Sequence, residues 1–210
     1  MSDMTTEPMT AQPRPATLTI PEMVKAVAFP NRLVELVLGN SDRLMSNVTE
    51  ERHLALLAAL LFGASLLFAI PFGAAPPVAA FWKVAALYAG SLTICFPSFY
   101  VFGRYLGLGL SLAQSLVVAL LVSTVSAIVS FGFFPIVWFI AATTRAGASL
   151  DASQLAAFLL GTGLLLGVVH LGRCLRGSAA LRRHPVMLAG WVCLLAFITW
   201  RMAGVLGLVG

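Results

Sequence analysis

Long apolar runs separated by short polar turns are the dominant pattern along this chain. A transmembrane helix needs about 20 consecutive apolar residues, and five runs come close to this length or exceed it. The pattern predicts five spans, at about 54–70, 78–102, 112–142, 155–171 and 186–208. The third run is longer than a bilayer requires, and Pro135 within it marks a kink. A continuous tilted helix and a broken one both fit this run, so four and six are the alternative counts.

The N-terminal quarter is polar and has a different pattern. Residues 1–21 are rich in Thr, Pro and Met without apolar periodicity, which predicts a disordered tail. Residues 22–53 form short amphipathic pieces broken by Pro30, which predicts amphipathic interfacial helices. Two interpretations stay open for them: helices that lie on the membrane surface and dock partners, or helices that pack on the end of the bundle. Thr49 is the predicted N-cap of the first span.

Composition agrees with a protein embedded in lipid. Hydrophobic residues make up 60% of the 210 residues, charged residues make up 10%, and the mean hydropathy is +0.95. Soluble domains carry about 25% charged residues, so a water-soluble fold would lack the side chains to cover its surface. The predicted fold class is therefore all-α, a polytopic transmembrane helical bundle filling residues 54–210.

The basic residues predict an orientation. Five spans place one group of arginines beside the N-terminus and a smaller group of bases on the other side. The first group is Arg43, Arg52, Arg104, Arg173, Arg176, Arg182 and Arg183, and the second is Lys83, Arg145 and Arg201. Because cytoplasmic loops carry the excess of Lys and Arg, the N-terminus is predicted inside and the C-terminus outside. Trp82, Trp138 and Trp200 fall near the predicted outer ends. The excess of basic over acidic residues is thus explained by membrane topology, and nucleic acid is not an expected partner.

Three groups of residues are candidates for structural or partner-binding roles. Pro97 lies inside the second span, where its missing N–H frees a carbonyl that Ser98 or a neighbouring hydroxyl can satisfy. Arg104, which ends this span, and Pro135, the proline of the third span, are candidates of the same group. Gly163 and Gly167 give the fourth span a small-residue face for helix packing, within the chain or between copies. The arginines from Arg173 to Arg183 fit anionic lipid headgroups, a protein partner, or a topology signal alone.

Residues that carry chemistry are scarce in the predicted spans. Beyond Glu51 the only carboxylate is Asp151, in a predicted outer loop. This argues against catalysis by paired carboxylates and against transport coupled through an intramembrane acid. His170 and Cys174 are four residues apart, as two metal ligands on one helix face can be, but a third ligand is not evident. We therefore predict no enzyme, no metal site and no cofactor.

The segment CFPSFYVFGRYLG, followed by SLAQSL, resembles the Ypt-interacting protein (YIP) superfamily, in particular its bacterial members. The corresponding residues are Cys95, Pro97, Ser98, Pro135 and the terminal helix from Trp191 to Gly210. The terminal helix departs from the family pattern, which has a glutamine and an Arg-Pro pair, by having Trp200-Arg201 and Val205-Leu206-Gly207. The resemblance covers residues 30–210 and implies five spans, a cytoplasmic N-terminal region and residence in the bacterial inner membrane.

These observations predict a non-enzymatic scaffold or accessory subunit that organises other membrane proteins, or copies of itself, in the bilayer. The alternative is a small channel or facilitator lined by Ser, Thr and Gln114 near the kinks at Pro97 and Pro135.

Overall fold

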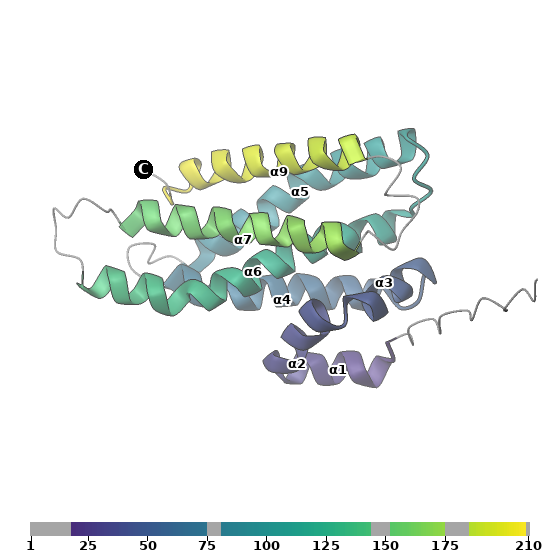
Figure 1. Ribbon diagram of the computed structural model, residues 1–210, viewed down its shortest axis with the longest axis horizontal. Coiled ribbons are helices and arrows are strands. Elements are labelled where there is room, and N and C mark those ends of the chain that lie inside the picture. Colours follow the sequence, from purple (N-terminus) through teal and green to yellow (C-terminus); the bar gives the residue numbers. More distant parts are fainter. Residues whose placement is uncertain (1–17, 75–80, 144–151, 175–184, 209–210) are drawn as a thin grey trace, which may run out of the picture.

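A computed structural model describes residues 18–74, 81–143, 152–174 and 185–208 (Figure 1). Every regular element in these ranges is a helix. The elements are α1 (Ile20–Ala28), α2 (Pro30–Val34), the π-helix η1 (Glu35–Gly39), α3 (Ser41–Thr49), α4 (Leu54–Ala74), α5 (Phe81–Tyr105), α6 (Leu112–Thr143), α7 (Ala152–Cys174) and α9 (Pro185–Val205). The predicted disordered tail, residues 1–21, lies mostly outside the described residues.

Four of the described helices are long and apolar enough to cross a membrane. Their apolar stretches are Leu54–Pro71, Trp82–Tyr105, Leu112–Ile140 and Leu188–Val205. The prediction of an all-helical protein is confirmed for the described residues. The length and composition of these four helices also agree with the predicted membrane spans. The predicted fourth span corresponds to α7, whose apolar stretch, Phe158–Cys174, is shorter than the other four.

Helix α6 is the centre of the bundle. In its apolar stretch 72% of the residues are buried, against 17% in α9. Helix α6 packs on α4, α5 and α7, whereas α9 packs mainly on α5. A helix that is apolar on all sides is expected to be surrounded, and α6 carries only small hydroxyl residues and Gln114 among its apolar ones. Helix α5 crosses the bundle obliquely (Figure 1).

The short helices gather at one end of the bundle (Figure 1). We call residues 18–49 the N-terminal cap. The end of the bundle at which this cap lies is called the cap end, and the opposite end is called the far end. Helices α4, α6 and α9 begin at the cap end, whereas α5 and α7 finish there. The three tryptophans predicted near outer ends, Trp82, Trp138 and Trp200, belong to the far-end parts of their helices and are exposed.

Both internal prolines of the long spans lie within uninterrupted helices. Pro97 is inside α5 and Pro135 is inside α6, and α6 runs continuously from Leu112 to Thr143. The interpretation of the third span as a broken helix is therefore wrong. The turn after α5 contains Gly107, whose φ of +75° is a left-handed conformation that glycine adopts without steric cost.

Several predicted boundaries need correction. Helix α1 begins at Ile20 rather than residue 22, because Glu22 accepts hydrogen bonds from both the N–H and the hydroxyl of Thr19, each at 2.9 Å. Thr49 is not an N-cap: it is the last residue of α3, and its hydroxyl donates to the Met45 carbonyl at 2.9 Å. Helix α4 continues through Pro71, which the sequence placed in a turn. A proline close to a helix end removes a single backbone hydrogen bond, so the helix tolerates it.

Candidate functional site

Polar side chains are buried along the length of α6. They are Gln114, Ser115, Ser123, Thr124, Ser126 and Ser130. Polar groups inside a membrane bundle must find partners within the protein, and most of these do. The hydroxyl of Tyr88 in α5 lies 3.2 Å from Ser126 Oγ and 3.0 Å from Ser130 Oγ. Thr124 Oγ1 lies 2.9 Å from the carbonyl oxygens of Leu61 in α4 and Leu120 in α6.

The two glycines singled out in α7 lie against this polar stripe. A Cβ atom added at Gly163 would lie 2.8 Å from Ser130 Oγ and 3.0 Å from the Ser126 carbonyl oxygen. A Cβ atom at Gly167 would lie 2.7 Å from the carbonyl oxygen of Val122. Contacts this short exclude a side chain, so the glycines let α7 approach the α6 backbone closely. The face of α7 that carries these two glycines is therefore covered by α6 of the same chain.

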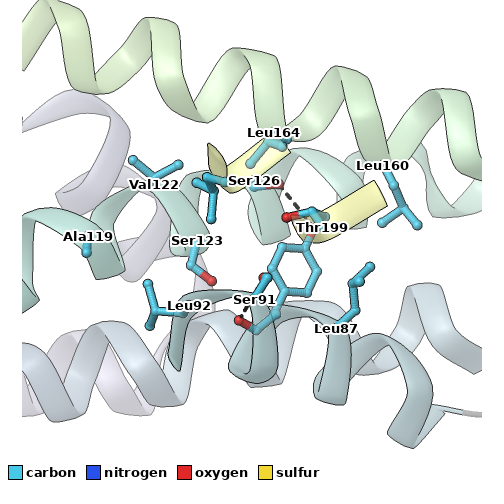
Figure 2. A pocket seen from close by; sticks show the side chains of 12 residues that line it. Leu87, Ser91, Leu92, Ala119, Val122, Ser123, Ser126, Leu160, Leu164 and Thr199 are labelled. Atoms are coloured by element: carbon cyan, nitrogen blue, oxygen red, sulfur yellow. Dashed lines mark hydrogen bonds between the residues drawn. The ribbon is translucent and has the colours of Figure 1, made fainter. Parts of the chain in front are cut away.

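A small cavity opens between α5, α6, α7 and α9 beside the stripe. Its volume is about 20 Å³, which is room for one water molecule. Its polar lining comes from Tyr88, Ser91, Ser123, Ser126 and Thr199. Figure 2 shows Ser123 from α6 and Thr199 from α9 beside the same space. Thr199 Oγ1 is buried and has no hydrogen-bond partner among the residues that the structure describes.

The N-terminal cap is fastened to itself and to the bundle by side-chain amides and one imidazole. Asn47, fully buried in α3, accepts from the Leu18 N–H at 2.8 Å and donates to the Leu18 carbonyl at 3.2 Å. Gln114 Nε2 of α6 donates to the Val48 carbonyl at 2.8 Å. His170 Nε2 of α7 lies 3.1 Å from the Val37 carbonyl oxygen in η1. A carbonyl can only accept, so this nitrogen carries the proton. The cap is therefore docked on the bundle.

The segment SLAQ at the start of α6 makes a capping box. The Ser111 N–H donates to Gln114 Oε1 at 2.8 Å, and the Gln114 N–H donates to Ser111 Oγ at 3.2 Å. Gln114 thus closes the helix start with its oxygen and holds the cap with its nitrogen. The sequence analysis missed this role, although serine followed three residues later by glutamine is a known signature of a helix start.

The part of α5 around Pro97 is braced by α9. The indole N–H of Trp191 donates to the Cys95 carbonyl at 3.1 Å, and its ring packs on Phe99 with centroids 4.7 Å apart. Pro97 itself is exposed on another side of α5. The Thr93 hydroxyl donates to the Ala89 carbonyl at 2.7 Å. The Ser98 hydroxyl makes no hydrogen bond with the described residues, so the role expected for Ser98 is not seen.

The remaining predicted site residues do not form one cluster. Arg104 and Arg173 are exposed near the cap end, at the ends of α5 and α7. Pro135 is exposed in the far-end part of α6. Arg176, Arg182 and Arg183 lie outside the described residues. Within the described ranges, no three His, Cys, Asp or Glu side chains gather as metal ligands would.

Comparison with known proteins adds no family to this description. No family model matches the chain, and neither a curated protein nor a solved structure matches it. The fold and the site define an all-helical protein with helices suited to a membrane and a docked N-terminal cap.

Proposed function

We propose that this protein is a non-enzymatic, five-span membrane scaffold that presents its N-terminal cap to partner proteins. The observation that carries the proposal is the way the cap is mounted. Gln114 of α6, which is buried, and His170 of α7, which is half-buried, hold carbonyls of the cap. Its outer side meanwhile exposes apolar residues, namely Ile20, Val24, Phe29 and Leu38. A fixed element with outward apolar side chains is what a docking surface requires.

Five spans require α7 to cross the bilayer as well. Its 23 residues rise about 1.5 Å each, which gives about 35 Å and exceeds the hydrocarbon thickness of about 30 Å. Its course supports this count, because α7 runs back along α6 and α9 then begins at the cap end (Figure 1). Membership in the YIP superfamily, and with it the bacterial inner membrane, remains a prediction from the sequence.

The orientation we propose puts the cap in the cytoplasm. Among the described bases, Arg43, Arg52, Arg104 and Arg173 belong to the cap or the cap end of the bundle, whereas Lys83 and Arg201 belong to the far end. An excess of arginine on the cap side supports a cytoplasmic cap under the positive-inside rule. The proposed partners are therefore cytoplasmic proteins or cytoplasmic parts of other membrane proteins.

Co-purification tests the scaffold. The full-length protein, tagged and extracted from its native membrane in mild detergent, is expected to bring down a stoichiometric partner. Phe29→Ser, in the cap, should release that partner. Phe158→Ser is the matched control, because Phe158 is also exposed but lies on α7 away from the cap. Retention of the partner by Phe29→Ser, or equal loss from both variants, would contradict docking on the cap.

The hydroxyl-lined cavity supports one alternative function, a small facilitator. Its Ser123 and Thr199 hydroxyls offer hydrogen bonds to a polar solute. The volume of about 20 Å³ admits only water, so a facilitator would need a second, wider conformation. Flux of small neutral solutes into liposomes that hold the purified protein would decide for this alternative, provided that Ser123→Val abolishes it.

A further inference from the structure

A second, larger concavity lies around Pro97, on the side of α5 that faces α4 and α6. Its volume is about 460 Å³. It is lined by Ala58, Ala59 and Phe62 of α4, by Leu92, Thr93, Phe96 and Pro97 of α5, and by Leu116 and Leu120 of α6. All three helices carry apolar stretches long enough to span a membrane. The cleft therefore opens at the depth of the lipid hydrocarbon.

The size and lining of the cleft limit what fits it. Apart from Thr93, whose hydroxyl is engaged with the Ala89 carbonyl, every lining side chain is apolar. The volume falls within the range of about 300–1,000 Å³ that is usual for small-molecule sites. An acyl chain, which is slim and apolar, fits this volume and this lining.

A basic side chain stands above the cleft on the same helix. Arg104 follows Pro97 by seven residues, which is two helical turns, so both lie on nearly the same face of α5, about 10 Å apart along its axis. Arg104 is exposed at the end of α5, and the structure gives it no ion pair with the residues that it describes. A guanidinium at the end of a membrane span is a natural partner for a phosphate, which it binds through two parallel hydrogen bonds.

We propose that this cleft binds one anionic phospholipid from the leaflet at the cap end. An acyl chain lies along Pro97 between α4 and α5, and the headgroup phosphate contacts Arg104. The small side chains of Ala58 and Ala59 on α4, opposite Pro97 on α5, explain why the site is here. The site does not depend on the scaffold function, because it uses no residue of the cap.

Lipid retention tests the site. The full-length protein is reconstituted in phosphatidylcholine bilayers containing a minor share of phosphatidylglycerol, extracted in mild detergent, and analysed by native mass spectrometry. Wild type is expected to keep one phosphatidylglycerol. Arg104→Gln should reduce its retention about tenfold, the loss expected for a charge-assisted hydrogen bond. Ala59→Phe should abolish it by filling the cleft. The thermal melts of both variants establish that they are folded.

Two controls match these variants. Arg201→Gln removes an exposed arginine at the far end, and Ala196→Phe adds a ring at an exposed alanine of α9. Both should retain the lipid as wild type does. Equal loss from the controls, unchanged retention by Arg104→Gln, or retention of phosphatidylcholine in place of phosphatidylglycerol would each overturn the proposal. A co-purified polypeptide that Ala59→Phe displaces would also overturn it.

Discussion

The indole N–H of Trp191 in α9 donates to the backbone carbonyl of Cys95 in α5 at 3.1 Å, two residues before Pro97. Trp191 is buried, unlike the three other tryptophans. Helix α9 has few other neighbours, so this hydrogen bond and the Phe99 contact fix it against the part of α5 around Pro97. Trp191 lies in the part of α9 at the cap end, whereas the other three belong to the far-end parts of their helices.

Replacing Trp191 tests how far this bond holds α9. Trp191→Phe keeps an aromatic ring against Phe99 but removes the donor, and we expect a loss of about 1 kcal/mol. For a protein of this size that lowers the melting temperature by about 2–4 °C. Trp200→Phe, at an exposed position of the same helix, is the matched control and should leave the melt unchanged. Equal melting temperatures for the two variants would show that the bond contributes nothing.

Much of the fold follows from hydropathy alone, because runs such as 54–70 and 112–142 are too apolar and too long for a soluble domain. Hydropathy does not predict which helices contact each other within the bundle. Helix α6 is apolar all round, so periodicity could not show which side faces α4 and which faces α7.

The docking of the cap was also beyond prediction. It depends on single side chains, Gln114 and His170, that bond backbone groups at least 66 residues away. No local pattern encodes such pairs. By contrast, the small-residue spacing of Gly163 and Gly167 did identify two positions that lie against another helix, because only glycine permits that approach.

The α6–α7 contact should be sensitive to one methyl group. In Gly167→Ala the new Cβ would meet the Val122 carbonyl, part of a backbone that cannot move aside. We expect a cost of about 1–3 kcal/mol, as for other overpacked sites. Gly161→Ala, on the same helix in open space, should be neutral or stabilising by up to about 1 kcal/mol. Thermal unfolding in detergent measures both, and a neutral Gly167→Ala would refute the close approach.

The start of the cap should respond to acid. Hydrogen bonds from the Thr19 backbone N–H and hydroxyl, and then the Arg43 guanidinium, lower the pKa of Glu22 below 4.5. A lowered folded-state pKa stabilises the cap above about pH 4.5, and this stabilisation is lost as the pH falls through the folded-state pKa.

The effect is small because the Glu22 side chain is 43% exposed. Amide hydrogen exchange in α1 should therefore be faster in Glu22→Gln than in wild type at neutral pH, with the two converging in acid. Glu51→Gln controls for loss of charge. Exchange in Glu22→Gln that matches wild type at neutral pH would contradict this account.

The Thr199 hydroxyl has no hydrogen-bond partner in the described part of the chain, which predicts a bound water. A buried hydroxyl without a partner is costly, and the adjoining cavity has room for one water molecule. We expect Thr199→Val to lose the hydrogen bond to that water and to lower the melting temperature by about 2–4 °C. Thr162→Val, at an exposed threonine of α7, is the control. A higher melting temperature for Thr199→Val would show that the cavity is dry.

The five-span arrangement with a cytoplasmic cap is tested most directly by cysteine labelling in intact cells. In a background without Cys95, Cys174 and Cys193, single cysteines replace Leu106, after α5, or Val205, at the end of α9. The account predicts that an impermeant maleimide labels Val205→Cys from outside, and Leu106→Cys only after permeabilisation. Protection of both positions would mean that α7 does not cross and that only four spans exist. Labelling of Leu106→Cys alone would place the cap outside and contradict the proposed docking of cytoplasmic partners.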